Sequence, residues 1–450
     1  MSVIAVVGAQ WGDEGKGRVV DYLAVDADLV VRYGGGNNAG HTVVNRHGHF
    51  KLHLIPSGIF YPETRNLLGN GVVIHPPALV RELDGLAAAG FDCANLFISD
   101  RAHLVMPYHI LLDQLEERER GSAKLGTTSR GIGPAYVDKV ARRGIRVIDL
   151  MEPDLFRERL TAALRRARRL VSGYFAAGGE GDEMRETIEE ATDEASIAAE
   201  YLAAGERLAD HVVDGHAMVD AALIAGQRIL LEGQLGTMRD IDWGIYPYVT
   251  SSNPIPGGAS IGAGLPAVAI DQVLGVAKAY TTAVGAGPLP TELLDADGEL
   301  LRERGVEYGT STGRPRRCGW YDAVAVNFSV RLAGYSSIVL TKLDVLDGFE
   351  RLRICVAYRD PLTGAEWRTV PASTSVYERL EPVYHDLPGW QTDTTACREW
   401  DELPPAARTY VDHLEELAGV RISLVSVGPE RDQMIVRGPS ATRGATALAP

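Results

Sequence analysis

VIAVVGAQWGDEGKG, residues 3–17, joins a short apolar run to a loop of glycines, acids and one lysine. The run is typical of a buried strand, and the glycines let backbone N–H groups converge on an anion. RVVDYLA, residues 18–24, follows as a helix whose N-terminal dipole faces the same point. We therefore predict a strand, a phosphate-binding loop and a helix, in that order.

The loop differs from the common phosphate-binding pattern G-x-x-x-x-G-K-[ST]. Its first glycine stands further from the lysine, and Gly17 occupies the place where Ser or Thr would hold Mg²⁺. Asp13 and Glu14 add carboxylates to a loop that should receive an anion. A solvated glycine-rich turn is the alternative, but the preceding strand and the charge of Lys16 favour phosphate binding.

Apolar runs that end in glycine or a polar turn recur along the chain, with amphipathic stretches between them. The runs cover residues 28–36, 228–236, 273–280, 336–348 and 421–429, and two amphipathic stretches cover 77–90 and 108–121. This alternation predicts an α/β fold, with a mostly parallel central sheet and helices on both faces. Ligands of such sheets bind at the carboxyl ends of the strands.

We expect a single large α/β catalytic domain over residues 1–437 and a flexible tail over 438–450. A helical insertion is predicted near 152–215, where a basic amphipathic helix at 153–170 precedes an acidic stretch at 178–196. The acidic stretch is predicted to be loose and the insertion to be mostly solvated. A membrane-bound basic helix is the less favoured alternative.

The formal net charge of −15 over 450 residues argues against a general nucleic-acid-binding protein. Local basic stretches at 130–146 and 312–318 can still bind small anions. No apolar run approaches the roughly 18 residues of a membrane helix, and nothing at the N-terminus resembles a signal peptide. The cysteines form no CxxC pair, so we expect reduced thiols and a cytoplasmic location.

RYGGGNNAGHT, residues 32–42, ends a second predicted strand with glycines and an Asn-Asn pair. Because two such strand ends open on one edge of the sheet, His41 is a candidate proton donor or phosphate contact. A structural histidine is the alternative. A zinc site formed by His47, His49 and His53 is not favoured without cysteine or carboxylate partners.

LTKLDVLDG, residues 340–348, follows another apolar run and is similar to the guanine-reading element of GTP-binding proteins. The carboxylate of Asp344 can accept hydrogen bonds from guanine N1–H and the 2-amino group, a donor pair that adenine lacks. Lys342 can pack its stem along the base. Together with a phosphate loop elsewhere, the element predicts GTP binding.

YGTSTGRPRRCGW, residues 308–320, contains the G-x-S-x-G pattern of nucleophilic serines, but the residues before it are polar rather than strand-like. An anion clamp is favoured instead, made by hydroxyls at 310–312 and by Arg314, Arg316 and Arg317. A solvated basic turn is the alternative.

In combination these motifs resemble the adenylosuccinate synthetase family. QWGDEGKG, NNAGHT, GTTSRGIGPAY, YPYVTSSN, GAGPLPTE, GRPRR and TKLDVLDG cover the chain from about residue 3 to about residue 437. The resemblance implies a fold like that of P-loop NTPases, with helical insertions, and a homodimer. It implies an enzyme of AMP synthesis that joins IMP and L-aspartate to adenylosuccinate with GTP and one Mg²⁺, through a 6-phosphoryl-IMP intermediate.

The resemblance also implies roles for individual residues. Asp13 would take the N1 proton of IMP and ligate Mg²⁺, with the carbonyl of Gly40 as the other protein ligand of the metal. His41 would assist the departure of the β-phosphate, and Lys16 would neutralise charge on the moving phosphoryl group. Arg142 is expected to reach the IMP phosphate in the partner subunit's active site.

The binding residues that the resemblance implies fall into three sets. IMP would contact Asp13, Asn38, Thr128, Arg142, Thr250 and Arg314. Aspartate would contact Thr310, Ser311, Thr312, Arg314 and Arg316. GTP would contact Gly12, Asp13, Glu14, Gly15, Lys16, Gly17, Gly40, His41, Thr42, Arg316, Lys342, Leu343, Asp344, Ser426, Val427 and Gly428.

Some positions depart from the family pattern. Gly34 and Leu235 stand where the family usually has glutamines near O6 of IMP, and Ala283 replaces a common arginine. We hypothesise that Gln234 takes over the O6 contact as a catalytic residue, with Gly34 leaving room for it.

Two alternative functions remain open. A related ligase for a 2-amino or otherwise altered purine nucleotide is one, because the altered positions are expected near the purine base. A GTP-binding switch or GTPase is the other, but it explains neither the arginine clamp nor Asp13 in the loop. No nucleic acid or membrane is predicted as a partner.

Overall fold

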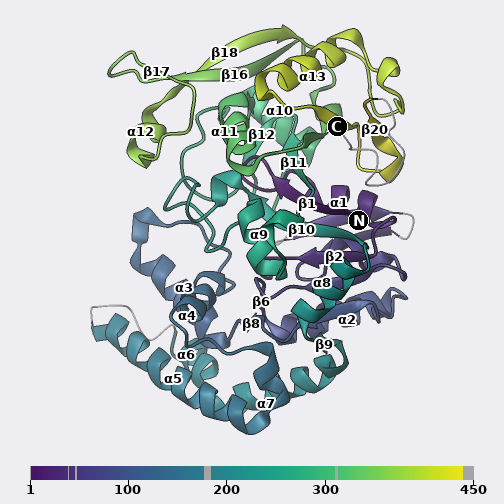
Figure 1. Cartoon of the computed structure of the whole chain (residues 1–450). Helices are drawn as coiled ribbons and strands as arrows, with labels where there is room; N and C mark the ends of the chain where they lie inside the picture. Colours follow the sequence, from purple (N-terminus) through teal and green to yellow (C-terminus); the bar gives the residue numbers. More distant parts are fainter. Residues whose placement is uncertain (1, 39, 46–47, 177–183, 310–312, 439–450) are drawn as a thin grey trace.

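The computed structural model describes residues 2–38, 40–45, 48–176, 184–309 and 313–438. A ten-stranded sheet runs through its centre (Figure 1). In spatial order its strands are β20 (Met434–Val436), β19 (Ile422–Ser426), β15 (Ser337–Thr341), β11 (Gln272–Lys278), β1 (Ser2–Gly8), β10 (Arg228–Gly236), β2 (Leu29–Arg32), β5 (Arg65–Leu68), β7 (Leu96–Ser99) and β9 (Val212–Val213). Neighbours are parallel except β19 and β20, which confirms the mostly parallel sheet.

Helices and smaller strand pairs surround the sheet. The α-helices are α1 (Lys16–Ala24), α2 (Pro76–Ala88), α3 (Pro107–Glu119), α4 (Ile132–Val140), α5 (Pro153–Ala176), α6 (Arg185–Thr192), α7 (Glu194–Leu208), α8 (Gly215–Ile224), α9 (Pro256–Ala263), α10 (Ala296–Gly305), α11 (Ala323–Ala333), α12 (Thr374–Arg379) and α13 (Pro405–Ala418). The smaller sheets pair β3 (His41–Asn45) with β4 (Gly48–Leu52), β6 (Val73–Ile74) with β8 (His103–Leu104), and β12 (Thr281–Ala283) with β13 (Arg317–Gly319). A further sheet joins β16 (Arg351–Arg359) to β14 (Tyr321–Asp322), β17 (Glu366–Trp367) and β18 (Glu381–Pro388).

The side chains of β1 show why helices cover both faces of the central sheet. A strand sends alternate side chains to opposite faces. Ile4 and Val6 lie in a core with residues of α1. Val3, Ala5 and Val7 lie in a second core with residues of α9, α11 and α13. The apolar run at the start of the chain is therefore buried from both sides, which confirms the expected arrangement.

The predicted insertion is helical, and most of its described residues are exposed or partly exposed, as expected, but the expectation of a loose acidic stretch is wrong. Where it is described, the acidic stretch forms α6 and begins α7. Phe156 and Leu160 of α5 share a buried core with Tyr201 of α7, because each helix carries apolar residues at helical spacing on its inner face. The Tyr201 hydroxyl donates a hydrogen bond of 2.7 Å to the carbonyl of Val105, outside the insertion.

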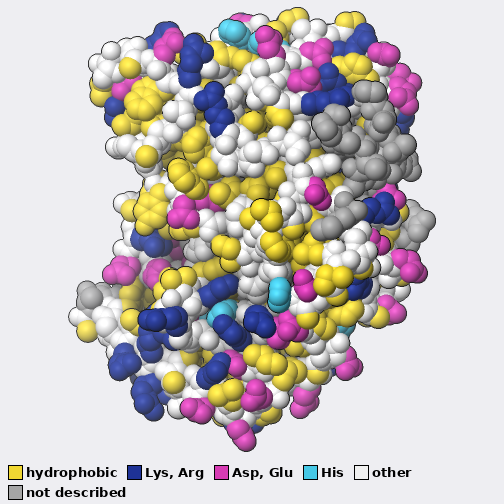
Figure 2. All heavy atoms as spheres, viewed as in Figure 1, with side chains coloured by type: hydrophobic (Ala, Val, Ile, Leu, Met, Phe, Trp, Pro, Cys, Tyr) yellow, Lys and Arg dark blue, Asp and Glu magenta, His cyan; other side chains and the backbone are white. Residues whose placement is uncertain are grey.

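The surface is unevenly charged despite the acidic total. Figure 2 shows Lys and Arg side chains gathered on the lower part of this face, over the region where α3 to α5 lie in Figure 1. Within the described ranges, no helix is long and apolar enough to cross a membrane. The four cysteines are unbonded, and Cys93, Cys318 and Cys355 are buried.

Candidate functional site

Six neighbouring strands, from β19 to β2, are parallel and end on the same side of the sheet. Five of these ends carry a predicted binding motif. β1 leads into residues 9–17, β2 into 33–41, and β10 contains Gln234 near its end. β15 leads into 342–344, and β19 into 427–428. Segments far apart in the sequence therefore meet along one edge, where ligands of parallel sheets bind.

The loop between β1 and α1 turns through left-handed backbone conformations. Gly12, Asp13 and Gly15 have φ angles of 107°, 55° and 90°. Glycine adopts such angles without strain, and aspartate is one of the few other residues that tolerate them. α1 begins at Lys16 directly after this turn, so the first N–H groups of the helix point toward the loop.

Glu14 organises the inside of this loop. Its buried carboxylate accepts hydrogen bonds from the N–H groups of Gln10 and Gly12, at 3.0 and 2.9 Å, and lies 2.5 Å from the ammonium of Lys16. A Cβ on Gly236 would lie 2.4 Å from the same carboxylate, which explains why β10 ends in glycine. The side chain of Glu14 thus holds the loop together, which leaves its main chain for the predicted GTP contact.

Asp13 faces an arginine of the predicted clamp. Nε of Arg316 lies 3.1 Å from a carboxylate oxygen of Asp13, whose side chain is 32% exposed. A terminal nitrogen of the same guanidinium donates a hydrogen bond of 2.7 Å to Glu307. Arg316 therefore connects the expected base for IMP to a carboxylate inside the protein.

Glu307 is the centre of a buried charged cluster. Its carboxylate lies 2.8 Å from the ammonium of Lys278 and 3.0 Å from that of Lys342, and it accepts a hydrogen bond from the hydroxyl of Tyr280. Burial alone would raise the pKa of Glu307, but Lys278, Lys342 and Arg316 outweigh it and hold the pKa well below its ordinary value. The carboxylate is therefore ionised at neutral pH.

His41 begins β3 and packs against the start of α1. A Cβ on Gly17 would lie 2.7 Å from the imidazole ring. Nε2 of His41 lies 3.7 Å from Glu232, and among the described residues it has no hydrogen-bond partner. Burial, reinforced by the charge of Arg32, lowers the pKa of His41 to about 3. The ring is therefore neutral at physiological pH.

The side chain of Gln234 bridges Arg32, the last residue of β2, and Asn38, which lies in the loop after it. Its side-chain oxygen accepts a hydrogen bond of 2.7 Å from Arg32, and its amide nitrogen donates one of 2.8 Å to Asn38. Gly35 gives the Gln234 side chain room, and the expectation that Gly34 also leaves room for it stays a prediction. A Cβ on Gly35 would lie 1.5 Å from the Gln234 oxygen, whereas one on Gly34 meets nothing within 4 Å.

The T-K-L-D element presents an unsatisfied acceptor. Oδ1 of Asp344 is buried and has no hydrogen-bond partner among the described residues. Burial raises the pKa of Asp344 to about 6. Guanine N1–H and its 2-amino group are donors that would satisfy such an acceptor. Arg18 of α1 donates to Ser426 and to the carbonyl of Gly428, which brings the end of β19 to the same region.

The remaining residues of the IMP and GTP sets differ in exposure. Thr128 and Thr250 are half-buried, and Arg142 is exposed on the turn after α4 with φ of 61°. Leu343 and Val427 are fully buried, which leaves their main chains for the expected GTP contacts.

The loop that carries the predicted anion clamp, residues 308–317, is closed at its base by main-chain hydrogen bonds. The N–H of Arg316 donates to the carbonyl of Glu307 at 2.8 Å, and Arg314 beyond it is exposed. Arg317 instead pairs with Glu292 at 2.5 Å and donates a hydrogen bond of 2.7 Å to the carbonyl of Gly287. Thr310, Ser311 and Thr312 lie outside the described residues, as does the side chain of Thr42.

Sequence reasoning missed four buried charged residues of the site: Arg32, Glu232, Lys278 and Glu307. Arg32 and Lys278 are the last residues of apolar strands, and Glu232 follows the apolar half of β10. A charged residue at the end of an apolar strand thus predicts a buried charge near the site. Glu307 follows a polar helix and carries no comparable pattern.

The donor set around the loop fits a magnesium ion that arrives with phosphates. Mg²⁺ in nucleotide enzymes is bound by one or two carboxylates together with phosphate oxygens and water. Asp13 is partly exposed beside the loop, whereas Glu14 is occupied by Lys16. In the part of the chain that the structure describes, no group of three His, Cys, Asp or Glu side chains forms a metal site.

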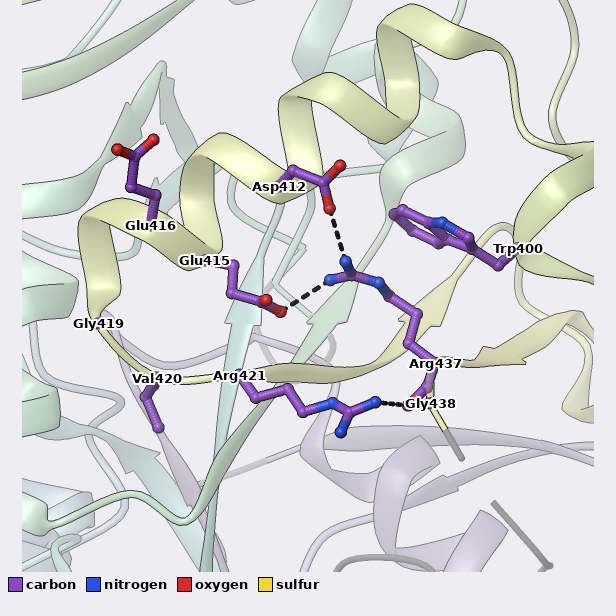
Figure 3. A pocket seen from close by; sticks show the side chains of 9 residues that line it. All are labelled: Trp400, Asp412, Glu415, Glu416, Gly419, Val420, Arg421, Arg437 and Gly438. Carbon is purple, nitrogen blue, oxygen red and sulfur yellow. Dashed lines mark hydrogen bonds and ion pairs between the residues drawn. The ribbon is translucent and has the colours of Figure 1, made fainter. Parts of the chain in front are cut away.

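A pocket of about 680 Å³ lies at the other side of the sheet, where β19 begins (Figure 3). Its lining residues are Trp400, Asp412, Glu415, Glu416, Gly419, Val420, Arg421, Arg437 and Gly438. Arg437 stacks on Trp400 at 4.0 Å and pairs with Asp412 and Glu415 at 2.6 and 2.8 Å. Arg421 directly precedes β19, so the pocket lies at the amino end of this strand, whereas the candidate site lies at the carboxyl ends. Arg437 is already paired within the pocket. The pocket is therefore separate from the candidate site.

Residues 5–435 match the family model described as adenylosuccinate synthetase. The chain is 51% identical to the adenylosuccinate synthetase of Heliobacterium modesticaldum, over 97% of this chain and 99% of that protein. The structure of fully ligated adenylosuccinate synthetase from Plasmodium falciparum has a TM-score of 0.89 and 36% identity, over 97% of this chain and 100% of the other.

A second solved structure is similar in fold alone. It is cyanophage S-2L succinoaminodeoxyadenylate synthetase bound to dGMP and dATP, with a TM-score of 0.57 and 19% identity over 99% of this chain and 98% of that chain.

Proposed function

Because this chain belongs to the adenylosuccinate synthetase family, we propose a role for each group along the strand ends. The family consists of GTP-dependent, GDP-forming ligases that join IMP to L-aspartate, and this chain is such a ligase. The altered-purine ligase is not favoured, since its structural relative shares 19% of residues against 51% for the family member. A GTP-binding switch is not favoured either.

The observation that carries the proposal is the meeting of Asp13, His41 and Asp344 on one edge of the sheet. Asp13 is the general base: it is partly exposed and takes the proton from N1 of IMP. O6 of IMP then attacks the γ-phosphorus of GTP, and the bond to the bridging oxygen of GDP breaks. The amine of aspartate attacks C6 of the resulting 6-phosphoryl-IMP, and inorganic phosphate leaves.

Lys16 and His41 act on the phosphoryl group in transfer. Lys16 stands at the N-terminus of α1, where its charge and the helix dipole both favour an anion. His41 is neutral, and Nε2 of its ring, which has no hydrogen-bond partner among the described residues, is suited to a hydrogen bond with the β-phosphate as GDP departs. Both groups stabilise charge that grows during transfer, which is the main requirement of this reaction.

Asp13 and the carbonyl of Gly40 would hold Mg²⁺ together with the phosphates of GTP. The metal would supply positive charge beside the β- and γ-phosphates. Asp344 and Lys342 would bind the guanine base, with Ser426 and Gly428 beside it, and Arg316 would contact both GTP and aspartate.

Gln234 would hold O6 of IMP in place of the glutamines that are absent at Gly34 and Leu235. Its amide now spans Arg32 and Asn38, so it is already fixed at the end of β10 beside the expected IMP contact. If Gln234→Ala retains the wild-type kcat and KM for IMP, this role is wrong.

We also propose a cytoplasmic homodimer in which Arg142 completes the partner subunit's IMP site. The exposure of Arg142 on the turn after α4 supports this role. Thr128, Thr250, Asn38 and Arg314 would hold IMP within the subunit itself.

The test is phosphate release with IMP, aspartate and GTP omitted in turn. Strict dependence on all three substrates is expected, whereas release from GTP alone would support a GTPase. A second assay replaces IMP with dGMP under the same conditions. Faster turnover of dGMP than of IMP would favour the altered-purine ligase.

A further inference from the structure

Glu307 lies between two parts of the site that have different tasks. On one side, Lys342 belongs to the element expected to read guanine, and its ammonium lies 3.0 Å from Glu307. On the other side, Arg316 bonds to Glu307 at 2.7 Å while it also faces Asp13 at 3.1 Å. One carboxylate thus contacts a cation from each part.

The position of Glu307 is itself tightly fixed. Lys278, at the end of β11, holds the same carboxylate at 2.8 Å, and both side chains are almost fully buried. The Tyr280 hydroxyl donates to the same oxygen, and the Glu307 carbonyl accepts from the N–H of Arg316 at 2.8 Å. Because the central sheet anchors it through Lys278, Glu307 is a rigid support for more exposed groups.

The position of the Lys342 ammonium depends most on this support. Its side chain is 31% exposed, and its ammonium also donates to the carbonyl of Gly305. A lysine on a flexible stem that stands near solvent loses its geometry readily unless a partner holds it. The same carboxylate holds Arg316, so loss of its charge would leave Lys342 with the Gly305 carbonyl, and Arg316 with Asp13, as their remaining partners.

We propose that Glu307 is a positioning residue that sets Lys342 and Arg316 for GTP through one buried carboxylate. The inference rests on the proposed function, because it assigns Glu307 to the binding of the same GTP. Glu307 touches no substrate in this role. Its effect passes through the two cations, and the IMP contacts at the ends of β2 and β10 stay intact.

Glu307→Gln keeps the shape of the side chain and removes its charge. KM for GTP and the dissociation constant for GDP, measured by calorimetry with Mg²⁺, are expected to rise about tenfold or more. The KM for IMP is expected to stay within about twofold of wild type. A merely structural residue would instead lower the melting temperature and the active fraction with no selective change in the GTP constants.

The matched control is Glu292→Gln, which removes the carboxylate partner of the adjacent Arg317. Arg317 bonds to Glu292 and to the carbonyl of Gly287 rather than to Glu307, so this variant is expected to keep its GTP and GDP constants within about twofold of wild type. An equal rise in both variants would contradict a specific role for Glu307.

A second variant covers the case in which Glu307→Gln fails to fold. Lys278→Met combined with Glu307→Gln removes both charges of the fully buried pair, so the ammonium of Lys278 is not left buried without a carboxylate. This double variant is expected to fold and still to bind GDP about tenfold or more weakly. Wild-type GDP binding by either folded variant would overturn the proposal. The substrate-omission assay on the wild-type enzyme tests the proposed function separately.

Discussion

The ammonium of Lys16 lies 2.5 Å from a carboxylate oxygen of Glu14, inside the loop that joins β1 to α1. The other oxygen of Glu14 binds two backbone N–H groups of the same loop. The acid next to the lysine is therefore part of the loop's own framework. It holds Lys16 at the N-terminus of α1 before any phosphate is bound.

Glu14→Gln should keep the two backbone hydrogen bonds and lose the ion pair. We expect the free energy of unfolding to fall by about 2 kcal/mol, the usual worth of a hydrogen bond to a charged group, together with a fall in kcat. Urea unfolding and steady-state rates measure both. Glu14→Ala should be less stable still, because it also leaves the N–H groups of Gln10 and Gly12 without their acceptor. Equal stability of wild type and Glu14→Gln would contradict this view of the loop.

Gly35 and Gly34 form a natural pair of test positions. Gly35→Ala places a methyl group on the Gln234 oxygen at a φ of +73°, so we expect a loss of about 2 kcal/mol or more and a raised KM for IMP. Gly34→Ala meets open space and should change stability by no more than about 0.5 kcal/mol. Thermal unfolding and IMP kinetics of the two variants decide the matter. Similar behaviour of both would show that Gln234 is not confined by Gly35.

The largely enclosed imidazole of His41 should make the protein less stable in mild acid. Its pKa falls from 6.5 to about 3, so between these pH values the unfolded chain binds a proton that the folded chain does not. Stability should therefore rise with pH, by roughly 1.4 kcal/mol per pH unit from this residue, up to about pH 6.5. Urea unfolding from pH 5 to 7 measures the slope.

His41→Asn is the variant for this pH series. Its slope should be shallower than that of the wild type, although not zero, because burial also lowers the pKa values of His75 and His103 to about 4. An unchanged slope would mean that His41 is charged in the folded protein.

Variants of Arg142 and of its neighbour Arg143 distinguish a residue that contacts substrate from one that forms a structural ion pair. Arg143 pairs with Asp138 at 2.7 Å, whereas Arg142 is exposed. Arg142→Ala should raise the KM for IMP about tenfold, the loss expected for one charged hydrogen bond, and leave stability unchanged. Arg143→Ala should lower the melting temperature with a smaller effect on IMP. A normal KM for IMP in Arg142→Ala would remove this residue from the substrate site.

The predicted sheet and the predicted motifs agree with the structure because each rests on a local pattern. An apolar run that ends in glycine predicts a strand from a few neighbouring residues alone. A parallel sheet then brings the carboxyl ends of these strands together. The prediction of a loose acidic stretch was wrong because net charge dominates residues 178–196, while the packing of α7 depends on a few apolar residues such as Tyr201.

The site was predicted less completely than the sheet. Glu307 lies next to Lys278, Lys342 and Arg316 only after the chain has folded, and no spacing in the sequence links these residues. The role of Gly35 was missed for a related reason. Gly35 has a φ of +73° and lies against the side chain of Gln234, and both properties exist only in the folded site. In the sequence, Gly35 cannot be distinguished from the neighbouring Gly34.

The place of β10 between β1 and β2 constrains how this protein is made. The first and second strands leave the ribosome early, but they have no direct partner in each other. The loop that holds Lys16 is complete only when residues 228–236 have been synthesised, on the order of 10 s after β1 at usual elongation rates. During that interval β1 and β2 lack the strand that lies between them in the folded sheet, so this part of the sheet assembles only after β10 has been made.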